Sequence, residues 1–294
     1  MTETEPLKDL LTKELKNLGF DVKNIDISVG TSYEATGEAL AAGTVDVGFI
    51  PGGTYVLYDD GADVILTATR DGLSNDSEAA KDWNDNKPTE KVDDQVTYYR
   101  GLFLAGPSEK GRELADKVNK GEELTWEDLD SANWSVMGTS SPAGYIYPSL
   151  LLSDKYDGKT IADLSNAVQS DSYASAFSRL ASGQVDVLLT YADARNDYED
   201  QWKDEFGGKN DIWSDVDVVE VTDKMMNDTI SVSKNSDHLT PELVDAIQQA
   251  MINIGNTPEG KKVIAVYSHN GYVEAKSEDY DLERKAQDFL RNQN

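Results

Sequence analysis

The sequence contains no cysteine, only two histidines and few basic residues, and each shortage excludes a class of function. Without thiols the chain has no thiolate metal site, no disulfide and no cysteine nucleophile. Lys and Arg number 27 against 55 Asp and Glu, a formal net charge of −28, so no basic surface is available for nucleic acid or an anionic membrane. We interpret the acidity as a solvated surface that keeps the chain soluble, while a local site of neutral dipoles can still bind an anion.

Long apolar runs and catalytic motifs are missing as well. No stretch reaches the roughly 18 apolar residues of a membrane-spanning helix, and the acidic start Thr2–Pro6 is unlike a signal peptide. The sequence has no HExxH motif, no complete calcium loop and no G-x-S-x-G motif. His238 and His269 stand in polar, exposed-looking contexts. We therefore expect no cofactor, no metal site and no enzymatic activity.

An eight-residue pattern occurs twice, as Leu40–Val47 (LAAGTVDV) and as Leu180–Val187 (LASGQVDV). In both copies an apolar helical pattern runs into a glycine, which ends helices because it enters the left-handed conformation without a Cβ clash. A buried apolar strand follows each glycine. With 294 residues the chain is long enough for two α/β cores. The repeat therefore predicts two lobes of related build, with a ligand cleft between them.

The order of the predicted elements indicates how the lobes are connected. Helix–strand units are followed by a crossing strand, further helix–strand units, a second crossing strand and final helices. This order is typical of a two-lobe α/β protein in which each lobe is a doubly wound, mostly parallel sheet and the second lobe is inserted into the first. We place lobe 1 at residues 1–105 and 222–294 and lobe 2 at residues 106–221. Strands are predicted at 22–29, 45–50, 64–68, 95–105, 134–137, 185–190, 216–221 and 228–232, and the polar stretch 71–94 is predicted to be a surface excursion.

The loop Gly138–Gly144 (GTSSPAG) is the first candidate site. It lies between a predicted strand and a predicted helix, and a helix N-terminus offers unpaired N–H donors and a partial positive charge to an oxyanion. Serine and threonine are equally common there as plain helix caps, so the loop alone leaves both interpretations open.

Tyrosines and two acids gather at other strand–helix junctions, the edges that line the cleft of an open α/β sheet. The tyrosines are Tyr33, Tyr55, Tyr98, Tyr99, Tyr145, Tyr173 and Tyr191. Asp193 follows a predicted strand and Asp228 opens another. Each acid is either a ligand contact or an ordinary cap or loop acid.

Five segments, in this order, carry a resemblance to a known family: Thr31–Leu40, Val45–Phe49, Thr97–Tyr99, Ser140–Tyr145 and Gly183–Val187. Over nearly its whole length the chain resembles the PhnD-like phosphonate-, phosphite- and phosphate-binding proteins of ABC importers, a branch of the type II periplasmic binding proteins. The resemblance implies a non-enzymatic, monomeric receptor outside the cytoplasm, at the cell surface or in the periplasm, with a lipid anchor on its precursor. Such a receptor closes its lobes on a phosphorus oxyanion and delivers it to a membrane permease.

The resemblance also implies a set of ligand contacts by position. They are the hydroxyls of Tyr33, Tyr98, Thr139, Ser140 and Ser141, and the carboxylates of Asp193 and Asp228. Tyr173 stands where some members have a histidine, and Tyr55 joins the set as a tyrosine at the edge of the cleft. A carboxylate suits such a ligand because a P–OH group can donate its proton to it, whereas sulfate has no such proton at neutral pH. The same acids could instead hold the ammonium of an aminoalkylphosphonate.

The chain also departs from the family pattern. The Ser-Thr-Ser-Gly run of the family reads Ser141-Pro142-Ala143-Gly144 here, which removes two hydroxyls and one N–H donor. The family has a strand before its first helix, whereas the first element predicted here is that helix. We therefore expect the first strand of lobe 1 to be absent and that lobe to be less stable.

Other functions fit the same fold. One is a receptor for another small anion or for an amino acid. More remote are a sensor domain, and a cleft enzyme of the porphobilinogen deaminase type, which needs a cofactor-attaching cysteine that the sequence lacks.

Overall fold

The structure is a computed structural model that describes residues 5–293, so residues 2–4 of the N-terminal segment lie outside the described range. The chain forms two compact units. Unit 1 runs to Gly72 and adds Asp93–Tyr98 and the chain from Met226 onward, and unit 2 comprises Leu73–Val92 and Tyr99–Met225. The excursion 73–92, which the sequence placed with lobe 1, is grouped with unit 2. Within the described range, no helix is long and apolar enough to cross a membrane.

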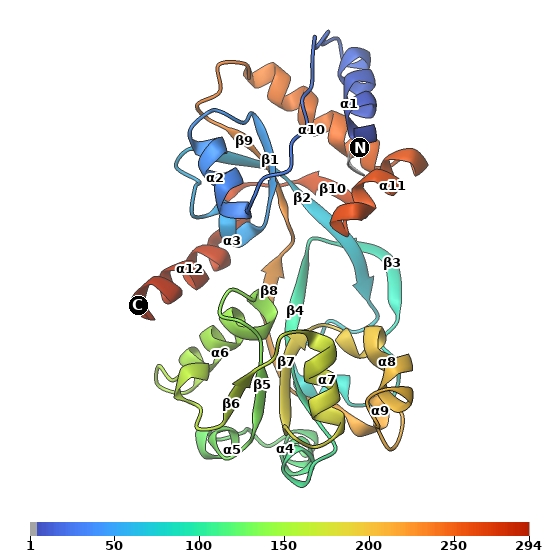
Figure 1. Cartoon of the computed structure of the whole chain (residues 1–294), viewed down its shortest axis with the longest axis vertical. Coiled ribbons are helices and arrows are strands. Elements are labelled where there is room, and N and C mark those ends of the chain that lie inside the picture. The colour runs from blue at the N-terminus through green and yellow to red at the C-terminus, as the bar shows by residue number, and fades with distance from the viewer. Residues whose placement is uncertain (1–4, 294) are drawn as a thin grey trace. The chain divides into compact units, whose positions relative to one another are not determined.

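Unit 1 is a sheet covered by helices (Figure 1). Its strands are β1 (Val47–Ile50), β2 (Ala62–Leu73), β9 (Thr229–Ser233) and β10 (Gly271–Glu274), in the order β1-β9-β2-β10, and β3 (Lys91–Val96) also pairs with β2. Its helices are α1 (Glu5–Asn17), α2 (Tyr33–Ala41), α3 (Gly52–Tyr55), α10 (Pro241–Gly255), α11 (Pro258–Ile264) and α12 (Asp281–Gln293), with 3₁₀ turns η4 (Ala265–Tyr267) and η5 (Ser277–Tyr280). The pairs β1–β9, β9–β2 and β2–β10 are all antiparallel.

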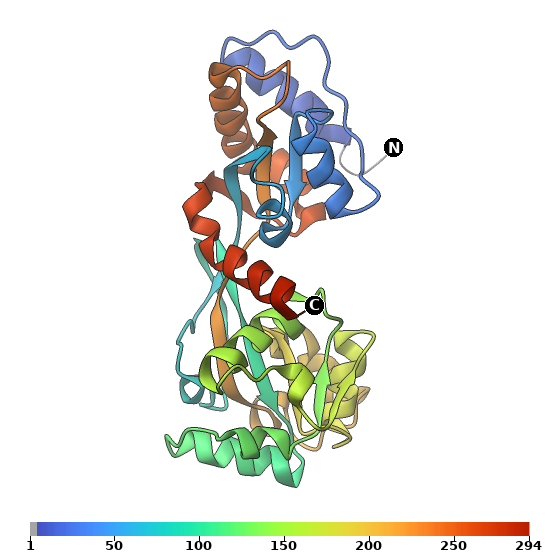
Figure 2. The ribbon, with the colours of Figure 1, turned by 90° about the vertical axis from the view of Figure 1, so that its left-hand side faces the viewer.

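Both faces of this sheet are apolar, as the short runs of Val, Ile and Leu predict. Along β1, Val47 and Phe49 pack on the core that α1, α10 and α11 cover, whereas Ile50 belongs to the core formed with α2, α3 and the turn η5. This alternation follows from the two-residue period of a strand. Figure 2 shows α1 and α10 together over one part of this unit, with α12 apart from them.

Unit 2 is a second sheet with helices on both faces. Its strands are β4 (Tyr98–Ala105), β5 (Trp134–Val136), β6 (Ala167–Gln169), β7 (Val187–Tyr191) and β8 (Asp217–Met226), in the order β6-β5-β7-β4-β8. Its helices are α4 (Glu109–Asn119), α5 (Trp126–Asp130), α6 (Tyr147–Lys155), α7 (Tyr173–Ala181), α8 (Ala194–Asp204) and α9 (Ile212–Asp215), with the short turns η1 (Ala80–Trp83), η2 (Pro142–Ile146) and η3 (Ile161–Asp163). The turn η2 is π-helical. Phe103 and Leu104 of β4 point into two different cores, so helices on both faces contribute to stability.

The sheets are mixed, which corrects the expectation of mostly parallel sheets. In unit 2, β5 runs parallel to β6 and β7, but β4 runs antiparallel to β7. In unit 1, β9 runs against both of its neighbours. The reason is that β4 and β9 are the strands through which the chain enters each sheet from the other unit, and β4 runs against β7 while β9 runs against β1 and β2.

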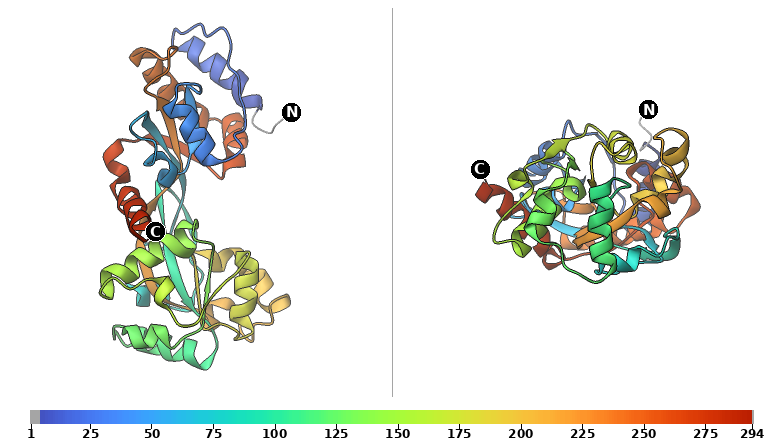
Figure 3. Two further views of the ribbon diagram at one scale, coloured as in Figure 1. Left: turned by 60° about the vertical axis from the view of Figure 1, so that its left-hand side comes forward. Right: turned by 90° about the horizontal axis from the view of Figure 1, so that it is seen from below.

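The predicted strand 22–29 is wrong, because these residues form an irregular segment (Figure 3). Val22, Ile25 and Ile27 still pack partly against the core under α1 and α10. The alternation of apolar residues in this segment therefore indicates contact with the core. A strand also needs a backbone partner, and the sheet order of the described residues gives this segment none.

The repeated pattern is confirmed as two copies of one helix-to-strand junction. Gly43 and Gly183 have φ angles of 75° and 71°, and each donates its N–H to the carbonyl of the leucine three residues earlier. The likeness extends to the start of each helix. Ser32 caps α2 by accepting from Ala35 N–H, and Ser172 caps α7 by accepting from Ser175 N–H. Tyr33 and Tyr173 consequently occupy equivalent first positions of the two helices.

Candidate functional site

The carboxyl ends of the parallel strands β5, β6 and β7 meet at one edge of unit 2, where an open α/β sheet binds its ligands. The loop after β5 carries Thr139 and Ser140, both exposed, and the half-buried Ser141. Ser141 caps η2, because its Oγ accepts from Gly144 N–H at 3.2 Å. Gly144 is required here, since a Cβ at this position would lie 2.4 Å from Cγ of Met137.

Two tyrosines stand beside this loop. The hydroxyl of Tyr173 lies 3.5 Å from Oγ of Ser141, and the rings of Tyr173 and Tyr191 meet edge to face at 5.1 Å. Tyr191 donates its hydroxyl proton to Asp197 at 2.7 Å. Burial raises the pKa of Tyr173, so its hydroxyl keeps its proton at neutral pH and remains a donor. The edge therefore offers hydroxyl donors and the N-termini of η2 and α7, a combination that suits an oxyanion.

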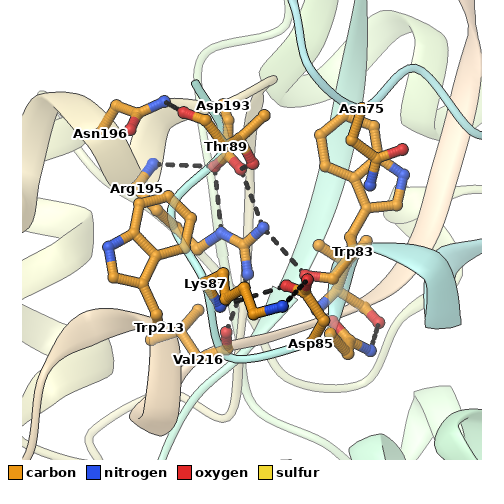
Figure 4. A network of polar contacts seen from close by, with 12 residues as sticks. Asn75, Trp83, Asp85, Lys87, Thr89, Asp193, Arg195, Asn196, Trp213 and Val216 are labelled. Atoms are coloured by element: carbon orange, nitrogen blue, oxygen red, sulfur yellow. Dashed lines mark hydrogen bonds and ion pairs between the residues drawn. The ribbon is translucent and has the colours of Figure 1, made fainter.

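Asp193 lies at the same edge but is buried in an ion pair (Figure 4). Its Oδ1 accepts from Nε and the backbone N–H of Arg195, and its Oδ2 accepts from Nη2 of Arg195 at 2.8 Å and from Oγ1 of Thr89 at 2.6 Å. The guanidinium also donates to the carbonyls of Val216 and Trp83 and lies 4.6 Å from the ring centroid of Trp213. In this conformation both oxygens of Asp193 are occupied within the protein, and the contact of Asp193 with a ligand stays a prediction.

The candidate tyrosines of unit 1 differ in accessibility. Tyr33 is 57% exposed at the start of α2, and Tyr98 is partly exposed at the start of β4. Tyr55 is 1% exposed, packs edge to face on Tyr280 at 5.4 Å and donates to Oγ of Ser277. The sequence placed Tyr55 correctly at a junction, but α3 turns its ring into the core, which leaves no accessible surface for a ligand in this conformation.

Asp228 lies between β8 and β9, and its side chain is 43% exposed. Its backbone carbonyl accepts from Ala68 N–H of β2, which anchors it to the sheet. Its Oδ2 lies 3.4 Å from Nε2 of His269. The structure corrects the expectation that His269 is exposed, because its exposed fraction is 5%. The residues before and after it in the sequence, Ser268 and Asn270, are polar and therefore do not indicate this burial.

Unit 1 also has a polar pocket of 260 Å³. It is lined by Asp71, Gln95, Lys261, Ala265, His269 and Asn270. Oδ1 of Asp71 accepts from the side-chain amides of Gln95 and Asn270, so part of the polar lining is already satisfied within the protein. Among the described residues, no group of three or more His, Cys, Asp or Glu side chains could hold a metal ion.

Comparisons with known proteins agree with this architecture. The sequence model of a family described as the periplasmic substrate-binding protein of the phosphonate ABC transporter matches residues 1–280. No curated protein gives a significant match to the sequence.

Solved structures resemble the chain at low identity. Mh-p37 of Mycoplasma hyorhinis is 15% identical with a TM-score of 0.69, over 95% of this chain and 90% of that one. XAC2383 of Xanthomonas citri, bound to ATP, is 12% identical with a TM-score of 0.63, over 99% and 93%. PhnD1 of Prochlorococcus marinus, in complex with methylphosphonate, is 14% identical with a TM-score of 0.54, over 99% and 94%. These likenesses confirm the predicted fold, that of a two-lobe type II periplasmic binding protein.

Proposed function

Because the chain belongs to the family of periplasmic phosphonate-binding proteins of ABC transporters, we propose that it binds a small phosphorus oxyanion and delivers it to a membrane permease. The match of the family over residues 1–280 is the observation that carries the proposal. The protein then acts outside the cytoplasm, as a monomer. It is a transport component and not an enzyme.

The geometry of unit 2 supports an oxyanion as the ligand. Ser141 and Tyr173 place two hydroxyls within 3.5 Å of each other at the start of two helices. Neutral donors of this kind can bind an anion even though the protein as a whole carries a charge of −28. Thr139 and Ser140 add exposed hydroxyls to the same loop.

Asp228 supplies the complementary acceptor in unit 1. A protonated phosphonate or phosphate can donate its P–OH proton to this carboxylate, whereas sulfate leaves the carboxylate facing an anion without a proton. Asp228 is the better candidate of the two predicted acids, because Asp193 already accepts from Arg195 and Thr89. Tyr33 and Tyr98 complete the proposed contacts from unit 1.

The test is calorimetric titration with methylphosphonate, 2-aminoethylphosphonate, phosphite, phosphate, ATP and sulfate. We expect at least one phosphorus compound to bind and sulfate to bind at least about tenfold more weakly, because its acceptor contact is lost. Tyr173→Phe should weaken binding, and its matched control Tyr198→Phe, on the neighbouring helix of the same unit, should not. Heat from an amino acid or another solute, with none from any phosphorus compound, would refute the proposal.

A further inference from the structure

Asp228 is linked to two buried side chains of unit 1 that no sequence motif marks. Nε2 of His269 lies 3.4 Å from Oδ2 of Asp228, and Nδ1 of His269 lies 3.1 Å from the hydroxyl of Tyr272. His269 and Tyr272 are each 5% exposed, whereas the side chain of Asp228 is 43% exposed. One oxygen of Asp228 therefore faces a buried imidazole while the carboxylate stays accessible.

The imidazole is held firmly in this position. The ring of Tyr272 meets it edge to face at 5.6 Å, and the ring of Tyr267 packs against it at the same centroid distance with an angle of 34° between the ring planes. Asn270, the next residue, donates its N–H to the carbonyl of Thr69, and Ala68 donates to the carbonyl of Asp228. Ala68 and Thr69, adjacent residues of β2, thus hold the backbone at both ends of the contact between Asp228 and His269. The sheet therefore determines the geometry of this contact.

The partners of His269, a hydroxyl that can donate and a carboxylate that can only accept, favour one of its tautomers. Burial raises the pKa of Tyr272, so its hydroxyl keeps its proton and can donate to Nδ1 of His269. A neutral imidazole that accepts at Nδ1 carries its proton on Nε2. That N–H points at Asp228, where a carboxylate oxygen accepts it.

We propose that Tyr272 and His269 are positioning residues that hold the Asp228 carboxylate so that its other oxygen accepts the proton of the ligand. The proposal rests on the proposed function, because Asp228 is assigned there to the ligand. Neither Tyr272 nor His269 touches the ligand in this scheme. Both act through Asp228, and the buried imidazole also prevents the carboxylate from turning away into the protein.

The tautomer of His269 tests the hydrogen-bond chain without any ligand. The sequence has two histidines, so ¹⁵N-labelled histidine gives a spectrum with His238 as the internal reference. Measured at a pH where the ring resonances no longer change, His269 should carry its proton on Nε2. Tyr272→Phe removes the donor to Nδ1 and should therefore change the ¹⁵N shift of Nδ1, while the proton stays on Nε2 because Asp228 still accepts it, and His238 should be unchanged. A proton on Nδ1 in the wild type, or no response to Tyr272→Phe, would overturn the proposal.

The second test measures whether His269 affects ligand binding. The ligand is methylphosphonate, or whichever phosphorus compound binds in the titrations above. His269→Phe removes the donor and should weaken binding about tenfold, the usual effect of one hydrogen bond to a charged group. His269→Gln keeps an N–H donor and should restore most of the affinity. The matched control is His238→Phe, since His238 also contacts an aspartate of unit 1, Asp46, at 3.1 Å.

Different results would refute the positioning role of His269 and the proposed binding of a phosphorus oxyanion. In an Asp228→Asn background, His269→Phe should cause no further loss, which separates action through Asp228 from a general structural effect. Wild-type affinity in a folded His269→Phe variant would refute the positioning role and leave the proposed function intact. A wild type that binds no phosphorus compound would refute the proposed function, and the tautomer measurement would still decide the hydrogen-bond chain.

Discussion

Replacing Asp193 by asparagine removes the carboxylate from the buried ion pair of unit 2 and leaves Arg195 charged at 1% exposure. Breaking such a pair costs about 3–5 kcal/mol, because the remaining charge has no compensating partner. Arg195 keeps its hydrogen bonds to the carbonyls of Val216 and Trp83 and its contact with the ring of Trp213. We therefore expect the free energy of unfolding of unit 2 to fall by about 3 kcal/mol, the lower end of the range.

The distribution of tryptophan makes this measurement specific. All five tryptophans lie in unit 2: Trp83, Trp126, Trp134, Trp202 and Trp213. Urea unfolding followed by tryptophan fluorescence therefore reports unit 2 alone, even if the two units unfold separately. The midpoint should decrease while the slope with urea stays unchanged, since the surface exposed on unfolding is the same.

The control is Asp85→Asn, because Asp85 also pairs with a basic residue two positions later but both side chains of that pair are more than half exposed. Its effect should stay within about 0.5 kcal/mol. Replacing Arg195 by methionine in the Asp193→Asn variant should recover part of the loss, because no buried charge then remains. A loss below about 1 kcal/mol for Asp193→Asn would show that Arg195 does not depend on this carboxylate.

Two further predictions concern stability. Burial raises the pKa of Glu220 above its usual range despite the ion pair with Lys155. Between the unfolded pKa, about 4.5, and the raised folded pKa, the folded state holds a proton that the unfolded state releases. The free energy of unfolding therefore falls as the pH rises through this window. Glu220→Gln should flatten this part of the curve in urea unfolding between pH 4.5 and 8, and an unchanged slope would contradict the assignment. Gly183→Ala should cost about 1 kcal/mol for its positive φ, whereas Gly43→Ala should cost more in calorimetric unfolding, since its Cβ would lie 2.3 Å from the carbonyl oxygen of Asn235. Equal losses in the two variants would contradict this difference.

Features that depend on local sequence could be predicted. The glycines at 43 and 183 end their helices, and the apolar runs after them form the buried strands β1 and β7, because cap geometry and strand burial are set within a few residues. Tyr33 and Tyr173 were placed correctly at junctions for the same reason. The segment 22–29 was not predicted correctly, because alternation reveals contact with a core but not the presence of a pairing strand.

The environment of individual side chains depends on residues far apart in the chain. Asp193 is buried partly by Thr89, which lies 104 positions earlier, and no local pattern indicates that contact. His269 is buried against Tyr267 and Tyr272 and faces Asp228, 41 positions away, although its immediate neighbours are polar. The residues that give these side chains their chemistry are therefore visible only once the fold is known.

The position of β1 at the end of its sheet bears on how the protein behaves in solution. A terminal strand presents backbone N–H and C=O groups that can recruit strands of other molecules and begin aggregation. Here the strand has only four residues, and the net charge of −28 repels a second copy. Repulsion acts over about 30 Å in 0.01 M salt but only about 3 Å in 1 M salt. In concentrated salt, the brevity of β1 is the remaining protection against self-association.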